Sequence, residues 1–406
     1  MNGMGLIADA GLFVLVPWLA WRLLGRVIPI AVLPIIVGIL LALTQWPVAR
    51  LGIPSASGNA IGWVAVLILA FTAGLEMWQH PGEDPNEVPV LPPTSLPRLL
   101  GSALVALAIP FTLGTLLVHT VLMPLPEWRA PDGHDWIGAM AVGLCIAVSA
   151  LPVLIGIVRE LAPADRPIGQ LALRLAVVDD LALWTGLATL QFAADGTAAL
   201  HGWQRGQFLA VLLLGGMVAI SGWATRRVRH PPLWLIWMVL PAWLAAGSWA
   251  SMQLGLHELI GAYVAGALMP PRWVRRLPVE QVGTFSLIWL APLFFGHSGM
   301  HINGHALTFP SVLASLLLVV VSIATKLAAV VLYPPAPALS GRQKLAVGTL
   351  LQCKGLMEIV AATILHQRGM ISDFAYASLM LLAVISTLLT GPMFRLFEGK
   401  AAPRAG

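Results

Sequence analysis

Long apolar runs separated by short polar loops are the dominant pattern of this chain. Each run has roughly 20 residues, enough to cross about 30 Å of hydrocarbon as a helix. Clusters of proline and polar residues end the runs, as at 81–93, 162–167 and 333–341. The pattern predicts about thirteen transmembrane helices, with twelve or fourteen also compatible because one run is short. The expected spans are 5–21, 27–46, 60–78, 98–122, 136–158, 168–194, 207–224, 232–253, 255–270, 281–300, 308–333, 343–366 and 374–396.

Composition supports a membrane protein and excludes several other classes. Hydrophobic residues make up 58% of the 406 residues and charged residues only 10%, whereas a soluble domain is about a quarter charged. The net charge of +5 comes from short loops beside apolar runs, so we expect no nucleic-acid partner. Cys145 and Cys353 both lie in apolar runs, with no disulfide or metal-ligand spacing. We therefore expect an all-α polytopic membrane protein with a single transmembrane domain at 1–406.

The arginine and lysine residues of the loops indicate an orientation. Arg22 and Arg26 follow the first run, which suits a first transmembrane helix better than a cleaved signal peptide. Arg226, Arg227 and Arg229 follow the seventh run, and the basic loops alternate with loops of few charges. Basic loops stay in the cytoplasm. The prediction is a multi-pass protein of the plasma membrane, with its N-terminus outside and its C-terminus in the cytoplasm.

Two adjacent carboxylates interrupt the apolar run between Leu171 and Leu190. Asp179 and Asp180 stand near its centre, and an acid there costs about 3 kcal/mol on insertion scales. Such a pair must hold a proton, a cation or a counter-charge. This favours a protein that moves or senses small cations. The alternative is a buried ion-pair network without a transport role.

Further charges lie within predicted spans, among them Lys326, Lys354 and Glu358. Lys326 is several residues inside its span, where it is either a partner for the aspartates or a lysine that snorkels towards the surface. Lys354 and Glu358 are four residues apart, a spacing that places both on one face of a helix. They could neutralise each other as a structural pair or belong to an ion site.

Two spans carry residues that break helices. Ser149 and Pro152 lie in the middle of the fifth span, and Gln352, Lys354 and Gly355 in the middle of the twelfth. These spans occupy matching places in two halves of the chain. Breaks at matching places predict two inverted-topology repeats with an ion site at mid-membrane. The alternative is a simple proline kink and a glycine that eases packing.

Several motifs in a consistent order extend over nearly the whole chain. They are Gly74–Glu76 (GLE), Ser149–Pro152 with Arg159 and Glu160, Asp179–Asp180, GLHELIGAYVAGALMP at 255–270, PLFFGHSGM at 292–300, Lys326, and KGLMEIVAATILHQRGMIS from Lys354. Together they resemble the monovalent cation:proton antiporters, of the sodium/proton exchanger type. This branch includes bacterial Na⁺/H⁺ and K⁺/H⁺ antiporters and plant cation/proton exchangers.

The resemblance implies roles for individual residues. Asp180 matches the acid that binds the cation or the proton, and Asp179 matches a position that is Asn, Gln or Asp in different members. Na⁺ or K⁺ is thus expected at Asp180 and Asp179. Ser149 matches a threonine that faces the ion, with Ala150 and Pro152 lining the same site. Lys326 matches a lysine that pairs with the first aspartate in charge-moving, sodium-type members. Gln352, Lys354 and Glu358 form the polar set of the second broken helix.

The same resemblance implies the fold and its division. It is the sodium/proton antiporter fold, with two broken helices that cross. Scaffold and dimer helices are expected at about 5–78 and 232–300, and core ion-transport helices at about 98–194 and 308–396. The chain departs from the family where GPS usually ends the second helix, since it reads GILLALT there. It ends soon after the last span, so no soluble C-terminal domain is expected.

These observations predict a secondary antiporter, not an enzyme, with no catalytic residues and no cofactor. It would exchange a monovalent cation (Na⁺ favoured, Li⁺ or K⁺ also compatible) for protons by alternating access, as a homodimer in the lipid bilayer. The rivals are a cation channel, an ion-sensing membrane protein and a symporter of similar fold. His257, His297, His301 and His305 could tune a pH response, although histidines near helix ends are more often surface residues.

Overall fold

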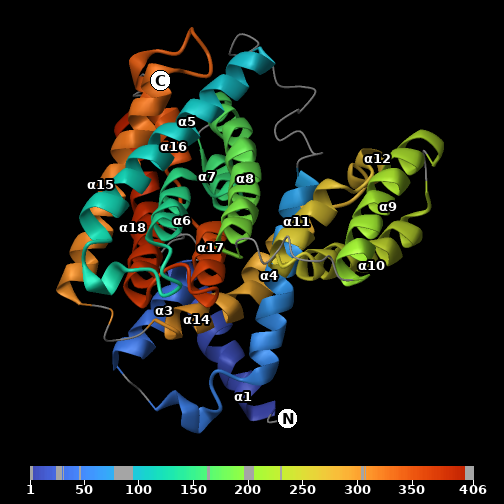
Figure 1. Ribbon diagram of the computed structural model, residues 1–406, viewed down its shortest axis with the longest axis horizontal. Coiled ribbons are helices and arrows are strands. Elements are labelled where there is room, and N and C mark those ends of the chain that lie inside the picture. The colour runs from blue at the N-terminus through green and yellow to red at the C-terminus, as the bar shows by residue number, and fades with distance from the viewer. Residues whose placement is uncertain are drawn as a thin grey trace, which may run out of the picture. The chain divides into compact units, whose positions relative to one another are not determined.

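The computed structural model is mainly helical over the part of the chain that it describes (Figure 1). It describes residues 3–23, 30, 32–44, 47–76, 95–161, 165–195, 205–228, 231–302, 306 and 308–397, without the side chains of a few residues inside these ranges. Predicted loop residues such as those at 81–93 fall outside it. Every regular element in the described ranges is an α-, π- or 3₁₀-helix.

Helices occupy the predicted spans. The helices of seven or more residues are α1 (Gly3–Asp9), α2 (Val16–Leu23), α3 (Val32–Thr44), α4 (Ala56–Glu76), α5 (Leu96–Leu117), α6 (Asp135–Ala147), α7 (Leu151–Glu160), α8 (Arg166–Asp195), α9 (Arg205–Arg227), α10 (Leu233–Gln253), α11 (Glu258–Ala267), α13 (Val279–Phe285), α14 (Ala291–Met300), α15 (Phe309–Leu332), α16 (Gly341–Leu351), α17 (Leu356–Gln367) and α18 (Asp373–Phe397). The π-helix η1 (Ala10–Leu15) joins α1 to α2, and η6 (Ser286–Leu290) joins α13 to α14.

Eight of the described helical segments are long and apolar enough to cross a membrane. Three shorter apolar helices, α3, α6 and α11, lie at further predicted spans. The number of about thirteen spans therefore stays a prediction.

Both predicted helix breaks are present. In the fifth span α6 ends at Ala147 and α7 begins at Leu151, with Val148 and Ala150 in extended conformation. Pro152 stands in the first turn of α7, where its missing N–H is not needed by the helix. In the twelfth span α16 ends at Leu351 and α17 begins at Leu356. Each predicted span is thus two half-helices joined by an unwound segment.

Lys354 differs from its expected position. It lies in the unwound segment before α17, whereas Glu358 lies in the first turn of that helix. The expectation that both residues share one helix face is therefore wrong, because the chain stops being helical between Leu351 and Leu356.

The chain divides into two compact units. The first unit contains 1–81, 184–307 and 363–370, and the second contains 82–183, 308–362 and 371–406. Whether they act as a scaffold and a transport core remains a prediction.

In the first unit, α4 packs against α11, and α3 and α4 pack against α14. Glycines allow this close approach. A Cβ on Gly74 would lie 2.1 Å from the carbonyl oxygen of Tyr263, and one on Gly266 would lie 2.1 Å from that of Phe71. Two helix backbones in a membrane can touch where small residues face each other.

In the second unit, α5 packs against α6 and α15, while α16 and α18 also pack against α15. Apolar residues of α5, α7, α8, α15 and α16 form its hydrophobic core, among them Ala106, Leu154, Leu175, Val330 and Leu350. Figure 1 shows α5, α6, α15, α16 and α18 together in this unit.

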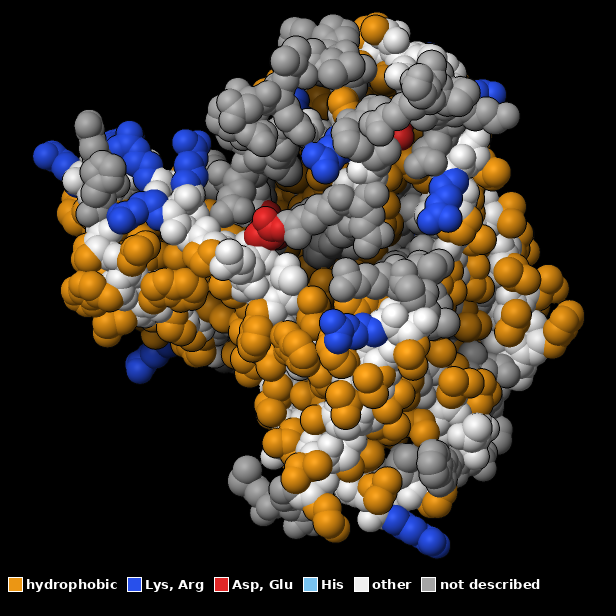
Figure 2. Space-filling view, turned by 180° about the vertical axis from the view of Figure 1, so that it is seen from behind, with side chains coloured by type: hydrophobic (Ala, Val, Ile, Leu, Met, Phe, Trp, Pro, Cys, Tyr) orange, Lys and Arg blue, Asp and Glu red, His pale blue; other side chains and the backbone are white. Residues whose placement is uncertain are grey.

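Large apolar side chains also cover the outer surfaces of several helices. Only 17% of the apolar stretch of α9 is buried, and only 22% of that of α10. Leu212, Trp234 and Met238 are among the exposed side chains. Figure 2 shows hydrophobic side chains over much of the visible face. Such a surface is stable in contact with lipid rather than water, so this is a multi-pass membrane protein.

Candidate ion-binding site

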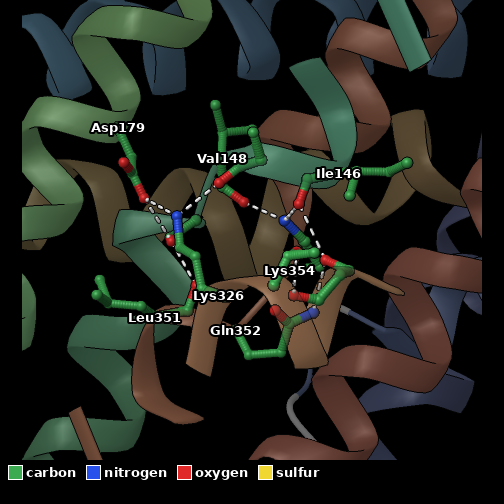
Figure 3. A network of polar contacts seen from close by, with 11 residues as sticks. Ile146, Val148, Asp179, Lys326, Leu351, Gln352 and Lys354 are labelled. Atoms are coloured by element: carbon green, nitrogen blue, oxygen red, sulfur yellow. Dashed lines mark hydrogen bonds and ion pairs between the residues drawn. The ribbon is translucent and has the colours of Figure 1, made fainter. Parts of the chain in front are cut away.

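The candidate site is centred on the carboxylate of Asp179, in the middle of the unbroken helix α8. Ser149 and Lys326 both contact its oxygen Oδ2 (Figure 3). The Lys326 Nζ–Oδ2 distance is 2.7 Å and the Ser149 Oγ–Oδ2 distance is 2.6 Å. Asp179 is 1% exposed and Lys326 is 0% exposed. The three side chains come from the first helix break, from α8 and from α15.

Lys326 has a second partner at the first helix break. Its Nζ donates a 2.5 Å hydrogen bond to the carbonyl oxygen of Ala147, the last residue of α6. The last carbonyls of a helix lack intrahelical partners and carry the negative end of the helix dipole. An ammonium group at this position satisfies a carbonyl and compensates a carboxylate at once.

Lys354 reaches the same helix end from the second break. Its buried Nζ donates 2.6 Å to the carbonyl oxygen of Ile146 and also bonds that of Val148 (Figure 3). The two breaks also meet through their backbones, since Ala150 N donates 2.9 Å to the carbonyl oxygen of Cys353. The unwound segments are therefore joined to each other and do not leave their polar groups exposed to lipid.

Gln352 and Ser149 connect the breaks to neighbouring helices. Gln352 Nε2 donates 2.8 Å to Ser322 Oγ on α15, and that hydroxyl donates 2.9 Å to the carbonyl oxygen of Ile146. The Ser149 hydroxyl lies against the Leu351 carbonyl oxygen as well as Asp179. Its single proton can serve only one of these two acceptors at a time.

Glu358 acts at the start of α17. Its Oε2 accepts 2.8 Å from the backbone N–H of Gly355, so the carboxylate caps the second half-helix. A carboxylate at a helix N-terminus is also favoured by the dipole.

Asp179 keeps one oxygen that no described group fills. Its Oδ1 is buried and has no hydrogen-bond partner among the residues that the structure describes. Asp180 follows on α8 and is 2% exposed. The site thus collects carboxylate, hydroxyl and carbonyl oxygens, which are the ligands of hard cations. Within the described part of the chain, no group of three or more His, Cys, Asp and Glu residues could hold a metal ion.

Comparison with known proteins shows which family the chain belongs to. The transmembrane domain of the sodium/hydrogen exchangers matches residues 10–397. The chain belongs to the sodium/hydrogen exchanger family. The match contains both helix breaks, α8 and α15, so the candidate site lies wholly inside the family's domain.

Relatives of this chain include plant and bacterial antiporters. The chain is 25% identical over 341 residues to cation/H⁺ antiporter 15 of Arabidopsis thaliana, an alignment that covers 81% of this chain and 39% of the plant protein. It is 26% identical over 306 residues to the Na⁺/H⁺ antiporter NhaS4 of Synechocystis, covering 71% of this chain and 72% of the relative. The chain thus spans less than half the length of the plant relative that it matches.

A solved exchanger has the same fold. The structure of the sodium proton antiporter MjNhaP1 from Methanocaldococcus jannaschii superimposes with a TM-score of 0.57 at 16% identity, covering 96% of this chain and 98% of that one. The predicted sodium/proton antiporter fold is therefore confirmed.

The structure brings most of the predicted site residues together. Ser149, Asp179 and Lys326 are in direct contact, and Ala150, Gln352 and Lys354 belong to the joined breaks. Asp180 is buried next to Asp179, Glu358 caps α17, and the side chain of Pro152 lies outside the described residues.

Sequence reasoning missed several polar residues of the site, among them Ser322 and Thr387. Ser322 joins Gln352 to Ile146, and the Thr387 hydroxyl donates to the carbonyl oxygen of Lys354. Ser322 could have been found, because it lies one helical turn before Lys326 on α15. Thr387 gives no such signal, since it stands in an apolar span without a neighbouring charge.

Proposed function

We propose that this exchanger is a secondary antiporter, which carries a monovalent cation and protons in opposite directions across the membrane. The observation that supports this most is the buried Asp179–Lys326 pair beside the two unwound segments of the broken helices. In such a pair, a transported cation can replace the lysine ammonium as the counter-charge of Asp179, whose Oδ1 has no hydrogen-bond partner among the described residues. The names of the relatives, cation/H⁺ and Na⁺/H⁺ antiporters, point to the same activity.

Competition at one site couples the two ions. Asp180 is buried, and in this proposal its carboxylate binds either a proton or a cation. A proton and a cation cannot occupy it together. Each crossing of the membrane in the cation-loaded state is then followed by a return in the protonated state, and the fluxes run in opposite directions.

Asp179 and Lys326 decide how much charge moves. Without a transported cation, the lysine ammonium neutralises Asp179. A cation shared by Asp179 and Asp180 takes over this role, and the released ammonium is then free to lose its proton. Two protons, from Asp180 and Lys326, leave for one cation that enters, so each cycle transfers net charge.

The remaining expectations complete the proposal. Na⁺ is the favoured cation, with Li⁺ and K⁺ as further candidates. Helices at about 98–194 and 308–396 carry the site in an alternating-access cycle, while those at about 5–78 and 232–300 form a scaffold and the interface of a homodimer. The protein resides in the plasma membrane with its N-terminus outside. Ser149, Ala150 and Pro152 line the ion path.

Everted membrane vesicles with an acid interior test this function. Addition of Na⁺, Li⁺ or K⁺ should release internal protons, read as recovery of the fluorescence of a pH-sensitive dye, and Asp180→Asn should abolish the response. Asp132→Asn is the matched control, because Asp132 lies outside the helices and accepts a backbone hydrogen bond from His134. A native protein that gives no cation-dependent pH change between pH 6 and 9 overturns the proposal.

A further inference from the structure

The first unit contains a second buried charge cluster, which the transport proposal does not use. Asp9 is the last residue of α1 and is 0% exposed, and His297 of α14 is 2% exposed. Asp9 Oδ1 and His297 Nε2 are 3.1 Å apart. The expectation that His297 is a surface residue is therefore wrong. His301 is exposed, and His305 lies outside the described residues.

Hydrogen bonds to Asp9 define its ionisation. Its Oδ2 accepts 2.9 Å from the backbone N–H of Ser55 and 2.6 Å from the Ser55 hydroxyl. That hydroxyl in turn accepts 2.9 Å from Gly58 N, which leaves its proton for Asp9. Two donors at one oxygen favour an ionised carboxylate, so the proton between Asp9 and His297 resides on Nε2.

The second ring nitrogen of His297 makes its charge variable. Nδ1 is buried and has no hydrogen-bond partner among the described residues. A proton on Nδ1 gives an imidazolium that neutralises Asp9, but this N–H then lacks an acceptor. Without that proton the ring is neutral and Asp9 keeps a net negative charge in an apolar setting. The two states are opposed by costs of similar kind.

Few other charges act on this pair. Among the elements that pack against α1 and α14, η1, α3 and η6 contain no ionisable residue. Arg50 on the 3₁₀-helix η2 (Val48–Leu51) is exposed, and Glu76 stands at the opposite end of α4 from Ser55. The Nδ1 of His301 lies 2.8 Å from the backbone carbonyl oxygen of His297. Asp9 is thus the dominant partner of His297.

Two glycines leave room for the side chains around the Asp9–His297 pair. A Cβ on Gly58 would lie 2.2 Å from Asp9 Oδ2, and one on Gly296 would lie 2.1 Å from the ring of Phe13. Phe13 packs edge-on against His297, with ring centroids 5.3 Å apart. Asp9, Ser55 and His297 therefore join α1, the start of α4 and α14 in a space that glycine alone leaves open.

We propose that Asp9 and His297 form a second proton-binding site, whose proton holds α1 and η1 against α4 and α14. With the proton bound, the pair is neutral and its burial costs little. When the proton leaves, an uncompensated carboxylate remains between the helices, and the packing of the first helix weakens. With the N-terminus outside, as the loop charges predict, the protonation of this site responds to the pH of the solution outside the cell.

Histidine NMR of the full-length protein in lipid nanodiscs tests the proton site. The ¹³Cε1 signal that disappears in His297→Gln belongs to His297. It should change with pH between 5 and 9, and its midpoint should move in Asp9→Asn but not in the control His301→Asn. A His297 signal that stays constant over this range overturns the proposal, as does a midpoint that Asp9→Asn leaves unchanged.

Hydrogen exchange tests the coupling to the first helix. The rate of amide hydrogen exchange is first corrected for its intrinsic dependence on pH. The corrected rate of residues 3–15 should rise over the pH range in which the NMR signal of His297 shows that the ring loses its proton. In His297→Gln the protection of this segment should be independent of pH. If protection in the native protein is flat while His297 titrates, the proposed coupling is wrong. If Asp9→Asn fails to fold, Ser55→Ala takes its place in the experiment. This variant keeps both Asp9 and His297, so its protection should still depend on pH.

An effect of the Asp9–His297 pair on transport rests on the proposed antiport activity. Loss of the pair in His297→Gln should shift the pH profile of cation-dependent proton release in vesicles. The two spectroscopic readouts need no transport, so failure of the antiport proposal and failure of this one are distinguishable.

Discussion

The ammonium group of Lys326 lies 2.7 Å from the carboxylate of Asp179, and both side chains are shut off from solvent. Removing one member of a buried ion pair leaves the other without compensation, which costs about 3–5 kcal/mol, whereas removing both can be nearly neutral.

We therefore expect Lys326→Met to lower the free energy of unfolding by about 3 kcal/mol. The double variant Lys326→Met, Asp179→Asn should recover most of that loss. Unfolding in mixed detergent micelles measures both, with Lys344→Met as a control because Lys344 lies in the first turn of α16, outside the buried network. Strictly additive effects of the two substitutions would contradict a direct pair.

Ser149→Ala should weaken cation binding, because it removes a hydroxyl from the carboxylate of Asp179 and from the carbonyl oxygen of Leu351. A lost hydrogen bond to a charged group is worth about 1.5–3 kcal/mol, or roughly a 10- to 150-fold rise in the cation concentration for half-maximal proton release. Dose–response curves in everted vesicles give this value. Ser149→Thr retains the hydroxyl and should stay within a few-fold of the native protein, and equal losses in both variants would argue against a role of the hydroxyl.

Lys354→Met should destabilise the protein more than Thr387→Val. The first change strips the Ile146 and Val148 carbonyls of a charged donor, at a cost of about 3 kcal/mol or more. The second removes one neutral hydroxyl contact to the Lys354 carbonyl, worth about 1 kcal/mol. Unfolding midpoints of the purified variants rank the two. The reverse order would mean that Lys354 does not hold the helix break together.

Gly74→Ala should separate α4 from α11, since the new methyl group would overlap the Tyr263 carbonyl oxygen. Overpacking of this kind costs about 1–3 kcal/mol. Gly215→Ala on α9 is the matched control, as a Cβ there meets nothing within 4 Å. Because alanine favours helices over glycine by about 1 kcal/mol, this control should be neutral or stabilising in thermal unfolding. A loss of stability in both variants would point to glycine flexibility rather than to close packing.

Much of the fold follows from local sequence. The long apolar runs of the sequence predict where the described helices lie. The breaks at Ser149–Pro152 and Gln352–Gly355 appear where proline, glycine and polar residues interrupt an apolar run. These are properties of short segments, which a single sequence displays directly.

The partners of the buried lysines do not follow in this way. Lys354 and Ile146 are 208 positions apart, and backbone carbonyls carry no signature in a sequence. The four-residue spacing to Glu358 suggested an intrahelical pair, yet the helix begins only after Lys354. Likewise, nothing near Asp9 in the sequence indicates that His297 lies beside it, because that contact joins segments 288 positions apart.

The two hydrogen bonds of Lys326 have a joint consequence. One nitrogen occupies both a carboxylate oxygen of Asp179 and the terminal carbonyl oxygen of α6 at Ala147. Under the proposed mechanism, a cation that displaces the ammonium group would gain two oxygen ligands in a single step, one charged and one neutral. Release of the cation would return both oxygens to the lysine, so the empty protein would not leave an unpaired helix end in the membrane.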